Sequence, residues 1–384
     1  MPKTSLDGVW ADLVGQEKLV ATLRRAVAGE PHAMTHAWLF VGPPGSGRSN
    51  AAKAFAAALQ CPQGGCGKCQ TCVTVLNGSH PDVTLVRTEK LSIGVDEVRQ
   101  LVRGAALAPA TGRYQILVIE DADRVTERGA DALLKSLEEP SARTVWMLCA
   151  PTSEDVVVTI RSRCRRVELV TPREQAISEL LQRRDDIDPE TAEFAARIAQ
   201  GHIGRARSLA ANADARARRV EMLSIPATLN SLGACLEAAQ SLVQAATAEA
   251  AAITTELDAA ELAQLSETLG ISGSKGRPRH AAAALAELED QQKKRSTRLQ
   301  RDCLDRVLTE LTSYYRDVLM HQTDSGEALI NRDFDTDIRH LATNSTPAAT
   351  LHKLDAILAC RQELMSNVTP LLAMESLLIA LSLN

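Results

Sequence analysis

The sequence has few aromatic residues: phenylalanine, tryptophan and tyrosine together make up 3% of its 384 residues. Hydrophobic residues nevertheless make up 45% of the chain, which is enough to bury several cores. Those cores must therefore be built mainly from alanine, leucine and valine. A chain of this length typically forms two or three domains.

The chain as a whole also lacks an excess of basic residues, since its formal net charge is -5. Contact with nucleic acid would therefore have to come from a local patch. No stretch approaches the roughly 20 apolar residues of a membrane-spanning helix. The first residues, MPKTSLDGVWADLVGQ, show no charged segment followed by an apolar one. We expect no signal peptide, no membrane partner and a cytoplasmic location.

Short apolar runs alternate with helical patterns in the first part of the chain, and the first helix is expected at 10–30. This alternation predicts βαβ units and a mostly parallel sheet flanked by helices. Beyond residue 171 the patterns are all helical, with breaks at 270–280 and 323–337. Strands are expected at 37–42, 82–87, 114–121, 143–151 and 165–170.

The sequence GPPGSGRS, from Gly42 to Ser49, follows an expected strand and precedes an expected helix. Gly42, Gly45 and Gly47 would let backbone N–H groups approach phosphate oxygens, as in the loop G-x-x-x-x-G-K-[ST]. The helix N-terminus would also favour an anion. Arg48 stands where that loop has lysine, and a planar, forked guanidinium does not replace a compact ammonium conservatively. The loop alone fits either a nucleotide site with a substitute cation or a turn without a ligand.

An acidic pair, Glu120 and Asp121, ends another expected strand, with Asp123 nearby. A site that hydrolyses nucleotide needs one carboxylate for magnesium and one to position water. Acidic residues at a strand end also occur as helix caps and in solvated turns. Side-chain length matters in metal geometry, so the order Glu-Asp bears on whether this pair could hold magnesium.

Four of the nine cysteines lie close together, as Cys61, Cys66, Cys69 and Cys72. In a cytosolic chain, cysteines are more often thiols or metal ligands than disulfides. The spacing C-x4-C-x2-C-x2-C predicts a structural zinc site closed by four thiolates. Free thiols, which would be prone to oxidation, and an iron–sulfur cluster are the alternatives.

Together these motifs resemble the clamp-loader branch of the AAA+ family. The resemblance covers about residues 8–210 and fits the helical remainder only loosely. It implies an AAA+ module at 1–171 with a zinc-binding insertion at 61–72, a helical lid at 172–225 and a helical collar for oligomerisation at 226–384. The segments that carry it, in the family's order and spacing, are DLVGQEKLVATLRRAV, HAWLFVGPPGSGRS, GSHPDV, LAPATGRYQILVIEDADRV, ADALLKSLEEP and TIRSRCRRVEL.

Three features depart from the active ATPases of that family. Those proteins have lysine in place of Arg48 and an Asp-Glu pair in place of Glu120-Asp121. They also have a lid arginine where this chain has Gly204, in the sequence GHIG followed by Arg205. Because all three departures affect one nucleotide site, we expect the loop to be retained scaffold with weak or absent ATP binding.

Ser162-Arg163-Cys164 matches the motif that supplies an arginine finger to the ATP of a neighbouring subunit in this family. A guanidinium is always charged and can bind two phosphate oxygens at once. Supplied in trans, it would make hydrolysis depend on correct assembly. Without the resemblance, the same three residues would indicate only a surface turn.

The resemblance therefore implies a stationary, non-hydrolysing subunit of the DNA polymerase III clamp loader. Its expected partners are gamma/tau and delta subunits, the sliding clamp and, through the assembled complex, primer-template DNA. The alternative is an active ATPase of the gamma/tau type that uses Arg48 in place of lysine. Residues 275–301 carry eight lysines and arginines, which fit either contacts to the DNA backbone or a solvated helix face.

Overall fold

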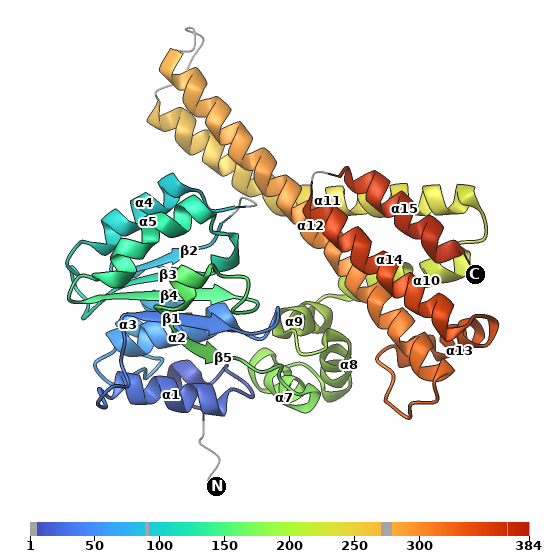
Figure 1. Ribbon diagram of the computed structural model, residues 1–384, viewed down its shortest axis with the longest axis horizontal. Coiled ribbons are helices and arrows are strands. Elements are labelled where there is room, and N and C mark those ends of the chain that lie inside the picture. The colour runs from blue at the N-terminus through green and yellow to red at the C-terminus, as the bar shows by residue number, and fades with distance from the viewer. Residues whose placement is uncertain (1–5, 89–91, 270–278, 367, 384) are drawn as a thin grey trace. The chain divides into compact units, whose positions relative to one another are not determined.

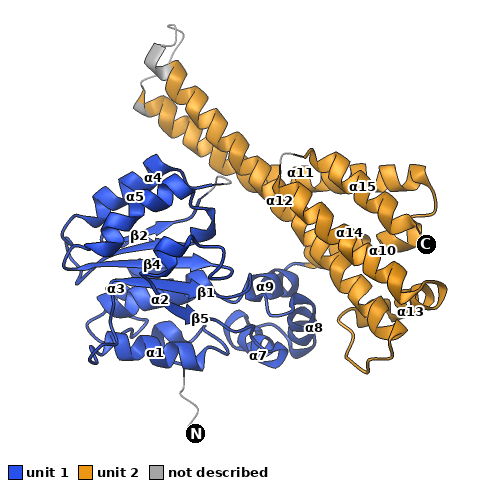
Figure 2. Ribbon diagram, viewed as in Figure 1, with its two compact units in different colours: residues 1–212 blue, residues 213–384 orange. Residues whose placement is uncertain are grey.

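The computed structural model describes residues 6–88, 92–269, 279–366 and 368–383 (Figure 1). The chain forms two compact units, Met1–Asn212 and Ala213–Asn384, which are coloured separately in Figure 2. Among the helices of the described ranges, none combines the length and the apolar character needed to cross a bilayer.

The first unit is built on a five-stranded parallel sheet with the strand order β2-β3-β4-β1-β5. All five strands begin and end within two residues of the predicted ranges, so the predicted parallel sheet is confirmed. The strands are β1 (Ala37–Val41), β2 (Val83–Val86), β3 (Gln115–Ile119), β4 (Thr144–Ala150) and β5 (Arg165–Glu168).

Helices cover both faces of this sheet, with α1, α2 and α3 on one side and α4 and α5 on the other (Figure 1). The helices of the first unit are α1 (Glu17–Val27), α2 (Arg48–Gln60), α3 (Gln70–Leu76), α4 (Val95–Ala105), α5 (Glu127–Glu138), α6 (Val158–Arg161), α7 (Glu174–Asp185), α8 (Pro189–Ala199) and α9 (Ile203–Ala211), with short 3-10 helices η1 (Gly8–Trp10) and η2 (Ala122–Arg124).

Two apolar cores explain why the inner strands β1, β3 and β4 are buried at every position. Trp38 of β1 packs in the first core against Phe55 of α2, with ring centroids 4.9 Å apart. Its neighbour Leu39 points to the opposite face and packs in the second core with Leu133 of α5. Burying each such side chain contributes about 1.5–3 kcal/mol. The alternation along β1 therefore ties both helical layers to one strand.

The first helix is shorter than the predicted range 10–30. It begins at Glu17, two residues after Gly15, and ends at Val27, two residues before Gly29. Both glycines have positive φ values, +74° and +72°, which are incompatible with a right-handed helix and readily adopted only by glycine. These two residues therefore limit α1 on either side.

Helices α7, α8 and α9 follow the sheet within the same unit. Asp188 caps α8 and accepts a hydrogen bond from the Thr191 backbone N–H at 2.9 Å. The helix ends at Gln200 in the left-handed conformation, and Gly201 follows with a φ of +90°. These two residues turn the chain sharply into α9, whose first turn contacts the loop after β1.

The second unit is helical, as predicted, and its described part contains α10 (Ala213–Thr228), α11 (Leu232–Thr268), α12 (Arg279–Gln322), α13 (Asp335–Asn344), α14 (Pro347–Met365) and α15 (Pro370–Ser382), with the 3-10 helix η3 (Arg332–Phe334). Helix α10 runs across the predicted boundary at 225, and its Leu223 packs in the core of this unit. The domain limits at 171 and 225 stay predictions.

Residues 279–301 of the basic segment lie on α12, whereas residues 275–278, which include Lys275 and Arg277, fall outside the described residues. Arg295 is 9% exposed and pairs with Asp258 and Glu261 of α11. Part of the positive charge of the segment is therefore neutralised between α11 and α12, which argues against a DNA contact by Arg295.

Candidate functional site

The loop Gly42–Ser49, here called the phosphate loop, connects β1 to α2 and has the strand-turn-helix context predicted for it. Gly45 and Gly47 have φ values of +80° and +93°, which allow the tight turn. Ser49 lies in the first turn of α2. In parallel sheets, ligands bind at the carboxyl ends of the strands, which is where this loop lies.

The guanidinium of Arg48 folds back onto the loop. Its Nη1 donates a hydrogen bond to the Gly42 carbonyl oxygen at 2.9 Å. Ser46 is 2% exposed, and its hydroxyl oxygen has no hydrogen-bond partner among the described residues. The cation that replaces the usual lysine is thus engaged by the backbone of its own loop.

His202 packs directly on the phosphate loop. A Cβ placed on Gly45 would lie 2.1 Å from His202 Cγ, so the imidazole occupies the space beside that glycine. The Ile203 N–H also donates to the Gly45 carbonyl oxygen at 3.2 Å. The first turn of α9 therefore closes over the loop. Sequence reasoning missed this role of His202, although its neighbours Gly201 and Gly204 marked the position.

The His202 imidazole is held in one orientation because it caps α9. Its Nδ1 accepts a hydrogen bond from the Arg205 N–H at 3.1 Å. Burial lowers the pKa of His202 from its usual value, and the positive charges of Arg205 and Arg48 act in the same direction. The ring that faces the loop is therefore neutral near pH 7.

The acidic pair lies at the end of β3, next to the phosphate loop. Glu120 forms an ion pair with Lys53 of α2 at 2.8 Å, and both side chains are mostly buried. Asp121 follows at the start of η2. Burial raises the pKa of Asp123, and the charge of Asp121 contributes to this increase. Glu120, the first residue of the predicted pair, already has a cation as its partner.

A hollow of about 260 Å³ adjoins the phosphate loop at Gly42. It lies among the ends of β1, β4 and β5, with Ser153, Glu154 and Arg166 at its edge. Pockets for drug-sized ligands measure roughly 300–1,000 Å³. This hollow is small for a nucleotide.

Ser162, Arg163 and Cys164 form the turn between α6 and β5. Arg163 Nε donates to Glu138 Oε1 at 2.8 Å, and its Nη1 donates to the Thr159 carbonyl oxygen at 2.8 Å. Ser162 Oγ accepts a further hydrogen bond from Nη1 at 3.2 Å. The Arg163 side chain is 36% exposed, so a charged group with fixed geometry lies at the surface.

Cys164 has a different environment from the arginine beside it. Its side chain packs against the second core of the sheet. Burial raises the pKa of the Cys164 thiol to about 12. The residue therefore stays a protonated, apolar anchor for the turn that carries Arg163.

The four clustered cysteines converge as the sequence predicted. Their sulfur atoms all lie within 4.8 Å of one another. Cys61 Sγ lies 3.8 Å from Cys66 Sγ and 3.7 Å from Cys69 Sγ. A tetrahedral zinc ion with Zn–S bonds of about 2.3 Å requires S···S distances of roughly 3.8 Å. The described cluster can therefore hold a metal ion such as zinc.

Backbone N–H groups surround these sulfur atoms. The Gln63 N–H lies 3.3 Å from Cys61 Sγ, and the Cys69 N–H lies 3.4 Å from Cys66 Sγ. Burial alone would raise the pKa of Cys61, but hydrogen bonds from the backbone outweigh it and lower the value to about 6. Donors of this kind stabilise thiolates, which are the form that binds metal.

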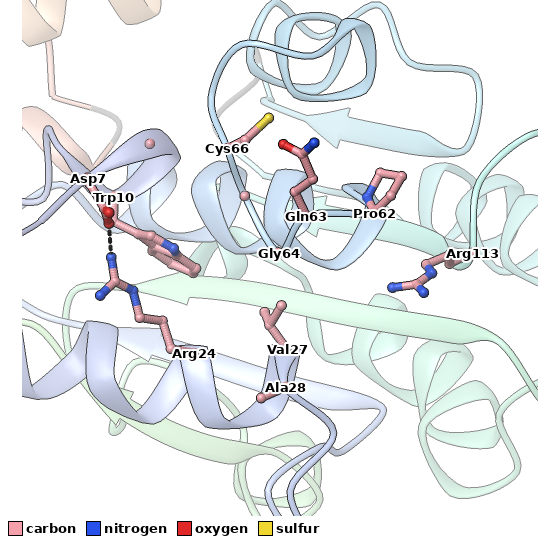
Figure 3. Close-up of a pocket in the computed structure, with 12 residues that line it drawn as sticks. Asp7, Trp10, Arg24, Val27, Ala28, Pro62, Gln63, Gly64, Cys66 and Arg113 are labelled. Carbon is pink, nitrogen blue, oxygen red and sulfur yellow. Dashed lines mark hydrogen bonds and ion pairs between the residues drawn. The ribbon is translucent and has the colours of Figure 1, made fainter.

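The loop of the cysteine cluster also borders a hollow of about 540 Å³, shown in Figure 3. Residues 62–66 form one wall, and Arg24 and Val27 of α1 form another. Arg24 pairs with Asp7 across its edge (Figure 3). The Val9 N–H donates to the Gly65 carbonyl oxygen at 3.1 Å, so the cysteine loop holds the residues before α1 in place.

Two segments of the chain match families of known proteins. The family described as "DNA polymerase III, delta subunit" matches residues 15–173. The family described as "DNA polymerase III, delta subunit, C terminal" matches residues 283–382. The chain therefore resembles DNA polymerase III subunits in both of its units. The first match includes the phosphate loop, the cysteine cluster and Ser162-Arg163-Cys164.

Relatives of this chain include both gamma/tau and delta' subunits of DNA polymerase III. The gamma/tau subunit of Mycobacterium tuberculosis is 36% identical over 159 residues, which cover 40% of this chain and 27% of the relative. The delta' subunit of Escherichia coli is 35% identical over 199 residues, which cover 50% of this chain and 58% of the relative. The chain thus spans between about a quarter and three fifths of the length of these relatives.

A solved structure, a gamma subunit-related protein of Thermotoga maritima, aligns with 91% of this chain and 100% of its own at 16% identity and a TM-score of 0.40. That score is too low to support a fold assignment. The assignment of an α/β fold to this chain therefore rests on its own strand order and on the helices that cover both faces of the sheet.

Proposed function

We propose that this chain is the delta-prime-type subunit of the DNA polymerase III clamp loader and that it does not hydrolyse ATP. In this role it acts in the cytoplasm within a ring of gamma/tau and delta subunits. The ring opens the sliding clamp and loads it onto primer-template DNA. The chain contributes a fixed AAA+ scaffold and an arginine finger.

The closed phosphate loop is the observation that carries this proposal. Arg48 donates to the Gly42 carbonyl oxygen, and His202 packs on Gly45. A nucleotide needs the N–H groups and the cation of the loop for its phosphates. To use Arg48 for the phosphates, this chain would have to release it from Gly42, and His202 already packs against the loop at Gly45. Both features support a scaffold role.

Arg163 is the proposed catalytic group, and it acts on a neighbouring subunit. Its exposed guanidinium is fixed by Ser162, while Cys164 anchors the turn in the core. A finger supplied in trans stabilises the charge of the phosphoryl-transfer transition state. The chain can therefore promote hydrolysis in its neighbour without binding ATP itself.

The cysteine cluster has a structural role in this proposal, with zinc as its metal. All four positions of a tetrahedral ion are taken by thiolates, which leaves none for a substrate or water. The nearby contact between Val9 and Gly65 joins the cluster to the start of the chain. Zinc would thus stabilise this side of the AAA+ module.

ATP binding to the isolated chain tests the scaffold role. Calorimetry with ATP and magnesium should detect no binding at low micromolar concentration, and the protein should show no turnover. Arg48→Lys is the matched variant, because it restores the usual loop residue while His202 stays in place. Tight ATP binding by the wild-type chain would refute the scaffold role.

An active ATPase of the gamma/tau type is the second candidate, and the 36% identity to such a subunit favours it. In that case Arg48 would leave Gly42 and reach the phosphates. Isolated protein should then hydrolyse ATP, and Asp121→Ala should abolish the turnover. If neither the isolated wild-type chain nor Asp121→Ala hydrolyses ATP, this candidate is excluded.

A further inference from the structure

The Arg163 guanidinium is almost fully occupied by acceptors of its own chain. A guanidinium has five N–H donors. Nε and Nη2 both donate to Glu138, and Nη1 donates to the Thr159 carbonyl oxygen and to Ser162 Oγ. These four contacts leave a single donor. A finger that binds two phosphate oxygens at once needs two donors on one edge.

Glu138 is placed where a carboxylate is unfavourable by itself. It is the last residue of α5. The C-terminus of a helix carries partial negative charge, so an acidic side chain there is destabilising unless a cation compensates it. Arg163, which comes from the turn after α6, supplies that cation. The pair therefore joins two separate elements through charge-assisted hydrogen bonds.

We propose that Glu138 holds Arg163 docked on its own chain until the triphosphate of the neighbouring subunit displaces the carboxylate. This inference rests on the proposed finger role of Arg163. A triphosphate carries more negative charge than one carboxylate, so the exchange is favourable once the neighbour binds ATP. The Ser162 and Thr159 contacts keep the turn in place while the Nε–Nη2 edge changes partner.

The exposure of the pair sets how strongly the finger is held. The Arg163 and Glu138 side chains are 36% and 49% exposed. Ion pairs at such exposed positions stabilise by little, because water and salt screen them. The contact is therefore strong enough to orient the side chain and weak enough to be broken by a nucleotide.

The test uses a clamp loader reconstituted from this chain, gamma/tau and delta, with ATPase measured without clamp and DNA. Glu138→Gln should raise kcat/KM for ATP, mainly through a lower KM, by up to about fivefold. Glu138→Ala should do the same, which guards against a defect specific to glutamine. Glu139→Gln is the matched control, since this exposed neighbour has the same charge and should change nothing.

The double variant identifies the route of the effect. In an Arg163→Ala background, Glu138→Gln should have no further effect, because there is no finger left to release. A fall in kcat/KM on Glu138→Gln alone would mean that Glu138 positions the finger productively. An unchanged kcat/KM would mean that Glu138 does not restrain Arg163. Either result overturns the restraint while leaving the finger role intact. If Arg163→Ala itself changes nothing, the finger role fails as well.

Discussion

Replacing Gly45 by alanine should destabilise the first unit more than the same change at Gly47. Both residues have positive φ, so alanine costs roughly 1–2 kcal/mol at either position from the backbone alone. At Gly45 the new Cβ would also lie 2.1 Å from His202 Cγ, whereas at Gly47 no atom lies within 4 Å. Overpacking of this kind adds about 1–3 kcal/mol. Gly45→Ala should therefore cost about 2–5 kcal/mol in total.

Urea unfolding followed by tryptophan fluorescence measures this difference. All three tryptophans, Trp10, Trp38 and Trp146, are buried in the first unit, so the signal reports on that unit. Adding His202→Ala should recover part of the loss in Gly45→Ala and none of the loss in Gly47→Ala, since only the first pair shares a contact. Equal costs for the two single variants would refute the packing of His202 on the loop.

Three further predictions concern metal and pH. The purified chain should carry about one zinc ion by elemental analysis, and Cys69→Ser should lose the metal and lower the melting temperature. Burial alone would raise the pKa of Asp82, but N–H donors of residues 110–112 keep it low. The contribution of the Asp82 carboxylate to folding stability should persist above pH 4 and disappear as pH falls through its lowered pKa. Asp82→Asn should lower the free energy of unfolding in urea by about 1–3 kcal/mol. Because the pKa of His202 is lowered, the stability gap between wild type and His202→Ala should shrink as pH falls below about 6.5.

The inner strands β1, β3 and β4 were predictable because they are buried on both faces. Such strands are continuous apolar runs bounded by turn residues, and a sequence shows them directly. The limits of α1 were less predictable, since an apolar pattern at helical spacing continued past both ends. The backbone conformation of Gly15 and Gly29 decided those limits. Glycine can lie inside a helix or just beyond its end, so its presence alone did not fix the limits of α1.

The candidate site was predictable where it depends on local spacing. The four cysteines converge because two short intervals and a glycine-rich turn bring them together. The contact of His202 with Gly45 joins residues 157 positions apart, and no local pattern predicts it. The same holds for Glu138 at the end of α5 and Arg163 in the turn after α6, which meet only in the folded chain.

The most direct test of the central claim is clamp loading by a reconstituted complex that contains Arg163→Ala. Arginine fingers are worth roughly 10³–10⁵ in rate at the ATP they contact. Other sites in the ring keep their own fingers, so total ATPase should fall by less than clamp loading. Arg184→Ala is the matched control, because Arg184 is 39% exposed and pairs with Asp12 at the surface. The proposal predicts a large loss of clamp loading with Arg163→Ala alone, and loading at the wild-type rate would contradict it.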